Sequence, residues 1–303
     1  MTLPAEYLEY PRRQRGMDHD FYPWSSLFDR APIVFPHRCK VAVAVVVSLE
    51  WFPIIAGDAP FKAPGHMQTA YPDFRHYTSR EYGTRVGFYR MLDLFEKAGV
   101  SVSVAANAAI AQRYPSIVAD IVSAGHEIVA HSVDMDGTID SSLPEADERL
   151  LIERSAEILQ QATGKRPRGW MSIARSQSFN TPRLLKEAGF SYMCDWVNDD
   201  LPYLFKTEAG SIVNVPVNHE LSDRQIITVQ QNSAESYAQQ MQDAHAWLAG
   251  EAAPRMLPLH ITPYIMGLPY RIGALESLIN WLAKQPDTAF LTTGEIADAL
   301  IAG

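Results

Sequence analysis

The sequence has little cysteine and no long apolar run. Only Cys39 and Cys194 occur among 303 residues, and both stand in apolar stretches typical of buried strands. Two isolated thiols favour a reduced, cytoplasmic protein over a secreted protein held by disulfides. No run approaches the ~20 apolar residues that a membrane helix needs, and residues 1–16 lack the apolar core of a signal peptide. We therefore expect a protein that is neither exported nor anchored in a membrane.

An excess of positive charge is also absent. The chain has 26 Lys and Arg against 35 Asp and Glu, which gives a formal net charge of -9. This charge is spread along the chain, so an anionic nucleic-acid backbone or membrane surface would be repelled. The sequence predicts no nucleic-acid partner and no membrane partner, and a small-molecule substrate is the expected ligand.

Strand and helix patterns alternate along most of the chain. From Lys40 to Glu50 the sequence is a continuous, largely β-branched run, which is typical of a parallel strand covered on both faces. Residues 57–80 have no clear period and are expected to form a loop. Amphipathic helical patterns follow, separated by short strand patterns, at 85–98, 115–124, 145–162, 181–190, 234–249 and 273–285. This order predicts an α/β fold, namely a deformed or incomplete (β/α) barrel of about seven parallel strands.

The length and composition favour a single domain. A chain of 303 residues with 47% hydrophobic residues can form one large core. We expect one domain over residues 1–303, in which the aromatic and proline-rich residues 1–38 wrap the surface.

Polar residues follow several of the predicted strands. Glu50 follows the first strand, His131 the third, Asp195 the fifth and His260 the seventh. In parallel barrels the catalytic groups project from the carboxyl ends of the strands, so these side chains are expected to converge. One carboxylate and two imidazoles are suited to general acid–base hydrolysis. A lone strand-end histidine is more often a structural hydrogen-bond partner, whereas an acid directly after a buried apolar run favours a function.

Eight segments carry a family resemblance: MDHDFYPWS (17–25), VVVSLEWFP (45–53), REYGTRVGFYRMLDLFEKAGV (80–100), AGHEIVAHS (124–132), TGKRPRGWMS (163–172), FNTPRLLKEAGFSYMCDWVNDDLPY (179–203), LPLHITPYIMGLPYRI (257–272) and TTGEIAD (292–298). With these segments in this order, the chain resembles the polysaccharide-deacetylase (NodB-type) superfamily, and within it the allantoinase-like branch of metal-independent cyclic amide hydrolases. The resemblance implies an incomplete barrel and hydrolysis of carbon–nitrogen bonds other than peptide bonds.

The resemblance also bears on metal binding. Classical deacetylases of this kind have paired acids after the first strand and a His-Ser/Thr-x-x-His motif, and the second acid and both imidazoles bind a divalent metal. The matching places here hold Glu50 with Trp51, and His131 with Met135. Two of the three expected ligands are absent, and a thioether is a poor ligand for zinc, so we expect no cofactor and no metal. A zinc site built on Glu50 and His131 would need one further acid, and the candidates are Asp134 and Asp136.

The departures from the classical pattern favour a small substrate. The segment SIARSQS (172–178), which includes Arg175, stands where glycan deacetylases share a Pro-rich, Tyr-containing motif, so a glycan groove is not supported. The sequence predicts ring-opening of a small cyclic amide, imide or ureide.

Each candidate residue has an expected role in that reaction. Glu50 would activate water, His131 would position it or polarise the carbonyl, and His260 would protonate the leaving nitrogen. Asp195 would orient an imidazole or an arginine from behind. The expected substrate-binding residues are Trp51, Glu81, Tyr82, Arg85, Trp170 and Asn198.

Two other functions remain open. One is a metal-dependent N-deacetylase of an acetylated sugar or polysaccharide, and the other is a catalytically silent ligand-binding relative. Loss of two metal-ligand residues motivates the silent relative, but retention of Glu50, His131 and His260 argues against it. The aromatic N-terminal segment and the exposed-looking stretch 263–270 predict a homo-oligomer.

Overall fold

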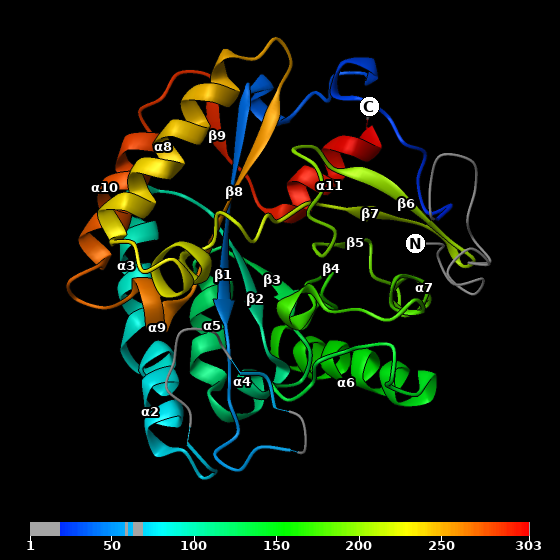
Figure 1. Cartoon of the computed structure of the whole chain (residues 1–303), viewed down its shortest axis with the longest axis vertical. Helices are drawn as coiled ribbons and strands as arrows, with labels where there is room; N and C mark the ends of the chain where they lie inside the picture. Colours follow the sequence, from blue (N-terminus) through cyan, green and yellow to red (C-terminus); the bar gives the residue numbers. More distant parts are fainter. Residues whose placement is uncertain (1–18, 58–59, 63–68, 303) are drawn as a thin grey trace, which may run out of the picture.

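A curled, mostly parallel sheet forms an open half-barrel at the centre of the molecule (Figure 1). The computed structural model describes residues 19–57, 60–62 and 69–302. Within them the strand order is β6-β7-β5-β4-β3-β2-β1-β8, and β9 also pairs with β1. The strands are β1 (Val41–Leu49), β2 (Ser103–Ala106), β3 (Glu127–Ala130), β4 (Gly169–Trp170), β5 (Tyr192–Met193), β6 (Tyr203–Thr207), β7 (Gly210–Asn214), β8 (Arg255–Ile261) and β9 (Thr288–Phe290). Every pairing is parallel except the β6–β7 hairpin, which confirms the predicted α/β incomplete barrel.

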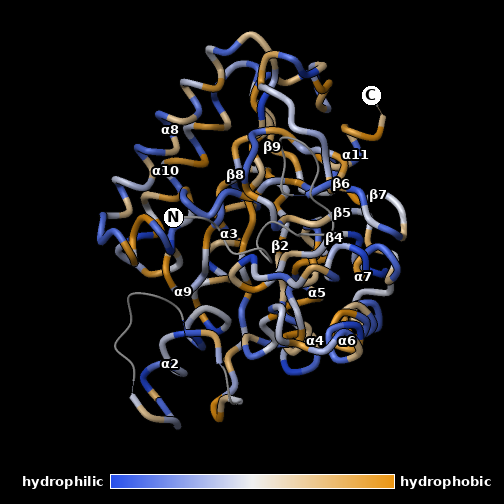
Figure 2. Tube along the Cα trace, turned by 45° about the vertical axis from the view of Figure 1, so that its right-hand side comes forward, coloured by the Kyte–Doolittle hydropathy of each residue, from blue (hydrophilic) through white to orange (hydrophobic). Residues whose placement is uncertain are grey.

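Helices cover the outside of this sheet. They are α2 (Phe74–Tyr82), α3 (Phe88–Ala98), α4 (Ala108–Arg113), α5 (Pro115–Ser123), α6 (Glu145–Thr163), α7 (Thr181–Glu187), α8 (Ala234–Gly250), α9 (Pro263–Met266), α10 (Ile272–Leu282) and α11 (Thr293–Ala302). Hydrophobic residues gather on the central strands, whereas hydrophilic residues lie mainly on the outer helices (Figure 2). No helix in the described ranges is long and apolar enough to cross a membrane.

The alternation of side chains along β1 separates the core into two layers. Val43, Val45 and Val47 pack outward against the helices, in the same cluster as Phe88 of α3. The alternate residues of β1 face the interior of the half-barrel, where Val46 packs in a second cluster. Because side chains alternate along a strand, the interior row of β1 continues to Ser48 and then to Glu50. The long apolar run therefore directs two polar side chains into the open end of the barrel.

The structure differs from two local predictions. The sequence predicts a loop over residues 57–80, but α2 begins at Phe74, where Asp73 caps it by accepting a hydrogen bond from the His76 backbone N–H. The helix sequence FRHYTSREY has no regular apolar stripe, so periodicity does not reveal it. The stretch 263–270 is not uniformly exposed either, since its first four residues form the buried helix α9.

Candidate active site

Glu50 lies at the end of β1, buried in an ion pair that joins three distant parts of the chain. Its Oε1 and Oε2 accept hydrogen bonds of 2.7 and 3.0 Å from Arg224 Nη2, and Oε2 also accepts from the Tyr264 hydroxyl at 2.7 Å. Arg224 opens the short π-helical segment η5 (Arg224–Val229), and Tyr264 comes from α9. Burial alone would lower the pKa of Arg224, but Glu50 beside it raises that pKa. Glu50 is therefore held between a permanent cation and a phenol.

His131, which follows β3, offers one free nitrogen to the site. Its Nδ1 donates to the backbone carbonyl of Met171 at 2.6 Å, because a carbonyl only accepts. This bond fixes the tautomer, so Nε2 is the unprotonated acceptor, and no described residue hydrogen-bonds to it. Burial lowers the pKa of His131, outweighing the opposing effect of Glu50, and keeps the ring neutral. A neutral imidazole with a free acceptor can orient a water molecule or take a proton from it.

His260 on β8 has both ring nitrogens engaged. Arg175 Nη2 donates to Nδ1 at 3.1 Å, so Nε2 carries the proton and donates to Ser48 Oγ at 2.6 Å. Burial lowers the pKa of His260 well below its ordinary value. The predicted role of proton donor to a leaving nitrogen does not fit this arrangement, because no ring nitrogen is left for the substrate. Because His260 Nε2–H donates to the Ser48 oxygen, the Ser48 hydroxyl hydrogen is not used in this bond and can be donated to another acceptor.

Asp195 lies behind the site and holds one of its loops. It accepts hydrogen bonds from the Ser172 backbone N–H at 2.7 Å, the Ser172 hydroxyl at 3.0 Å and the Gln177 amide at 2.7 Å. Burial raises its pKa to about 6. The loop that it holds carries the Met171 carbonyl that fixes His131, and also carries Arg175. Asp195 thus holds the loop through Ser172 and Gln177 and makes no direct hydrogen bond to an imidazole or an arginine among the described residues.

A pocket of about 190 Å³ opens where these groups meet. Glu50, His131 and His260 all line it, so the three predicted strand-end residues do converge. The other lining residues are Ser48, Phe61, Met171, Ala174, Arg175, His219, Ser222, Arg224 and Gln225. We call this the acid–imidazole pocket. It brings one carboxylate, two arginines and three imidazoles around a single small space.

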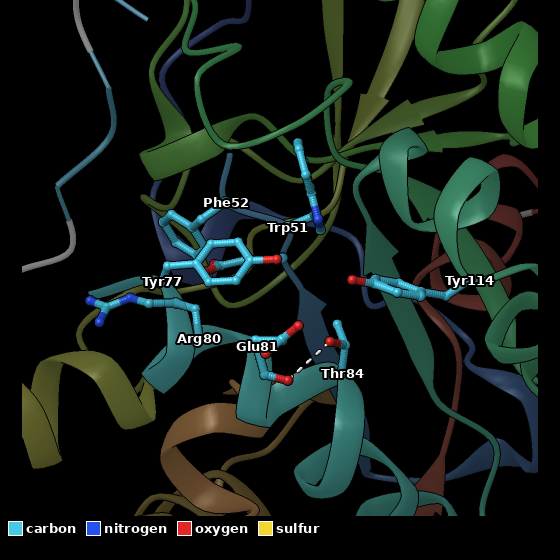
Figure 3. Close-up of a pocket in the computed structure, with 8 residues that line it drawn as sticks. Trp51, Phe52, Tyr77, Arg80, Glu81, Thr84 and Tyr114 are labelled. Carbon is cyan, nitrogen blue, oxygen red and sulfur yellow. Dashed lines mark hydrogen bonds between the residues drawn. The ribbon is translucent and has the colours of Figure 1, made fainter. Parts of the chain in front are cut away.

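A second, much smaller hollow lies at Glu50 and is shown in Figure 3. Its volume is about 10 Å³, which is room for roughly one water molecule. Trp51 and Glu81 line it, as do Phe52, Tyr77, Arg80, Thr84 and Tyr114. In Figure 3 the hydroxyls of Tyr77 and Tyr114 and the Glu81 side chain point toward a shared space, whereas the Arg80 guanidinium points away from it. Trp51 and Glu81 therefore lie against a water-sized space rather than against the larger pocket.

The structure places four of the predicted substrate-binding residues outside both spaces. Trp170 is fully buried, and its indole donates to Ser172 Oγ at 2.8 Å. Strand alternation explains this, because Met171 faces the interior and Trp170 faces the helices. Tyr82 accepts from Arg90, and the Arg85 side chain is 72% exposed beside Glu81.

Asn198, the fourth, belongs to a different surface. It donates to the Tyr22 hydroxyl and accepts from the Tyr203 hydroxyl, each at 2.8 Å, and lines a separate pocket with them. These contacts hold the N-terminal segment against the β6–β7 hairpin. They do not bring Asn198 to Glu50.

Comparison with known proteins agrees with this architecture. The polysaccharide deacetylase family profile matches residues 80–193. A crystal structure of a probable polysaccharide deacetylase from Pseudomonas aeruginosa PAO1 is 28% identical, covers 93% of this chain and 98% of its own, and superposes with a TM-score of 0.84. Puue allantoinase is 29% identical at the same coverage, with a TM-score of 0.83. These matches confirm the predicted resemblance to the polysaccharide-deacetylase superfamily.

The likeness to Puue allantoinase supports a place in the allantoinase-like branch of this superfamily. A curated relative, a putative polysaccharide deacetylase of Schizosaccharomyces pombe, is 26% identical over 88% of this chain and 91% of its own length. The similar proteins are deacetylases and an allantoinase, which supports the predicted class of enzyme, a hydrolase of carbon–nitrogen bonds other than peptide bonds.

The side chains present in the pocket do not fit the metal of classical deacetylases. Met135 stands where the second imidazole is expected, and it is buried in the core. Neither Asp134 nor Asp136 lines the acid–imidazole pocket. The Asp136 side chain accepts a hydrogen bond from the Gly57 backbone N–H at 2.6 Å, and the Asp134 side chain accepts one from the Asp136 backbone N–H at 3.0 Å. Within the described ranges no three His, Cys, Asp or Glu side chains are grouped to hold a metal. The positive charge beside Glu50 comes from Arg224 instead.

Proposed function

We propose that this hydrolase opens the ring of a small cyclic amide, imide or ureide. The observation that carries the proposal is the acid–imidazole pocket, whose volume of about 190 Å³ suits a single small ring. This is below the roughly 300–1,000 Å³ of sites for drug-sized ligands, and far below what a glycan chain needs. Similarity to Puue allantoinase supports the same class of substrate.

In the proposed reaction, Glu50 and His131 activate the attacking water. Among the described residues, Oε1 of the Glu50 carboxylate accepts a hydrogen bond from Arg224 alone, so it keeps a lone pair that can accept a water proton. His131 Nε2 can accept the second hydrogen of that water and so direct its lone pair at the carbonyl carbon.

The carbonyl oxygen needs hydrogen-bond donors as negative charge develops on it. The Ser48 hydroxyl fits this role, because His260 Nε2–H already occupies its oxygen and leaves its hydrogen to point into the pocket. Arg224 lines the same wall and adds positive charge. His260 is then a positioning residue that acts through Ser48.

The ring opens when the carbon–nitrogen bond breaks. A bond from the water oxygen to the carbonyl carbon has formed, and the proton taken by Glu50 passes to the departing nitrogen. The products are a carboxylic acid, which releases its proton to solvent and becomes a carboxylate, and an amine or amide on the same chain. No group outside the pocket and the water is needed to balance this step.

Replacing Glu50 tests the proposal. Glu50→Gln keeps the side-chain volume and removes the base, so kcat on a hydrolysed hydantoin, succinimide, allantoin or dihydropyrimidine should fall on the order of 10²–10⁴-fold. Glu96→Gln on the exposed face of α3 is the matched control and should retain full activity. Near-normal turnover by folded Glu50→Gln would remove Glu50 as the base.

A metal-dependent N-deacetylase is the alternative, favoured by the deacetylase family match and the S. pombe relative. Metal analysis followed by chelation separates the two. Stoichiometric zinc whose removal abolishes hydrolysis of an acetylated sugar would replace our proposal. A homo-oligomer and a cytoplasmic location remain predictions, and exposed Trp24 and Phe28 are consistent with the first.

A further inference from the structure

Arg175 stands out in the acid–imidazole pocket because its charge has no direct counter-ion among the described residues. Its Nε and Nη2 donate to the Val217 carbonyl at 3.0 and 2.9 Å, and Nη2 also donates to His260. Across the described ranges, no carboxylate forms an ion pair with it within 4.0 Å. Burial lowers its pKa to about 10, so the guanidinium is still charged at neutral pH.

The other charged groups of the pocket do not balance Arg175. Glu50, the one carboxylate among the lining residues, is already paired with Arg224. Asp195 is the nearest carboxylate behind the wall, but Ser172 and Gln177 occupy its oxygens. Of the three lining imidazoles, His131 and His260 are kept neutral by burial, and His219 lies 2.9 Å from Glu220. The wall around Arg175 therefore presents an unmatched positive charge.

The backbone that carries Arg175 is strained at the pocket wall. Ala174 has φ 53° and Arg175 has φ 56°, both in the left-handed region that non-glycine residues avoid. Residues in this conformation lower the stability of the fold, and they persist only where the surrounding structure holds them. Asp195 and the Val217 carbonyl hold this turn in place from either side. The fold thus keeps an unpaired guanidinium at the pocket wall at a cost to stability.

We propose that Arg175 binds a carboxylate of the substrate, so that the preferred substrates are small cyclic amides, imides or ureides that carry a carboxylate group. This inference rests on the proposed function. A guanidinium donates to a carboxylate through parallel N–H groups, and its remaining Nη1 donors have no partner among the described residues. A carboxylate matches one guanidinium charge for charge, whereas a doubly charged phosphate would add repulsion beside Glu50. The ring carbonyl then lies between Arg175 and the Glu50–His131 pair.

Two matched pairs of compounds test the inference. Dihydroorotate differs from dihydrouracil, and hydantoin-5-acetate from hydantoin, by a carboxyl-bearing substituent. Wild-type enzyme should prefer the anionic member in kcat/KM by on the order of 10–100-fold, as expected for a hydrogen-bonded charge pair. Arg175→Met should abolish this preference mainly by raising KM for the anionic member, and Arg175→Lys should restore part of it.

Binding measured by calorimetry covers the remaining outcomes. If both neutral and anionic rings are hydrolysed but the wild type does not prefer the anionic ring, the carboxylate inference fails and the proposed function stands. If Arg175→Met lowers kcat/KM equally for the neutral and the anionic ring of a pair, Arg175 acts on the ring carbonyl that both share, and the inference is also overturned. If no ring is hydrolysed, the proposed function fails. The carboxylate site is then tested by binding alone, and it is rejected if wild-type protein binds dihydroorotate no more tightly than dihydrouracil.

Discussion

The ion pair between Glu50 and Arg224 should make a large, measurable contribution to stability. The Glu50 side chain is 2% exposed and that of Arg224 is 16% exposed, so each variant that removes one partner leaves the other charge mostly buried. Breaking a buried pair in this way costs about 3–5 kcal/mol, and the partial exposure of Arg224 favours the lower end. Glu50→Gln and Arg224→Met should each lower the free energy of unfolding by about 3 kcal/mol.

The double variant isolates the interaction itself. With both partners replaced, neither charge is left buried without its counter-ion, and the amide oxygen introduced by Glu50→Gln can still accept from the Tyr264 hydroxyl. We expect the double variant to cost less than the sum of the single variants, with a coupling energy of about 2–3 kcal/mol. Urea denaturation at pH 7 measures all four proteins.

An exposed pair in the same chain is the control. Asp93 and Lys97 on α3 lie 2.6 Å apart, but their side chains are 61% and 67% exposed. A double-mutant cycle on Asp93 and Lys97 should give a coupling energy of about 0.5 kcal/mol or less. If the Glu50–Arg224 substitutions were additive within about 0.5 kcal/mol, the pair would not hold Glu50, and the geometry on which the proposed base depends would be unsupported.

Two further predictions concern pH and packing. Burial lowers the pKa of His131 and His260. Below about pH 6.5 the unfolded chain therefore binds protons that the folded chain does not. As the pH is lowered, the free energy of unfolding should decrease by up to about 1.4 kcal/mol per pH unit for each histidine. His260→Gln should flatten this slope in urea titrations between pH 7 and 5, and an unchanged slope would contradict the assignment. At Gly87 an added Cβ would lie 2.2 Å from the Pro263 carbonyl oxygen, so Gly87→Ala should lower the free energy of unfolding by about 1–3 kcal/mol and disturb α9 with Tyr264. Gly273→Ala in α10, where nothing lies within 4 Å, is the control and should be neutral or slightly stabilising in the same thermal melts.

The convergence of Glu50, His131 and His260 was predictable because it depends on local pattern. The apolar run of β1 identifies a parallel strand, and a residue that follows such a strand lies at the open end of the barrel. Side-chain alternation then decides which of two neighbours faces inward. No knowledge of distant contacts is needed for this step.

The partners of Glu50 could not be predicted in the same way. Arg224 is 174 positions away in the chain and Tyr264 is 214 positions away, and neither ends a strand. Arg224 begins a π-helical segment, which has no marked sequence signal, although such segments recur at functional sites. Only the packing of η5 and α9 over β1 brings these groups to the carboxylate.

The two arginines of the pocket have different partners, and this difference divides their tasks. Arg224 is bound to Glu50 through both carboxylate oxygens, so its charge acts first on the base. Within the described part of the chain, Arg175 has only a carbonyl and a neutral imidazole as acceptors, so its charge is available to a ligand. Loss of Arg224 should therefore lower kcat for neutral and anionic rings alike, whereas loss of Arg175 should separate them. A pocket in which both substitutions had the same effect on both rings would require a single shared role for the two guanidinium groups.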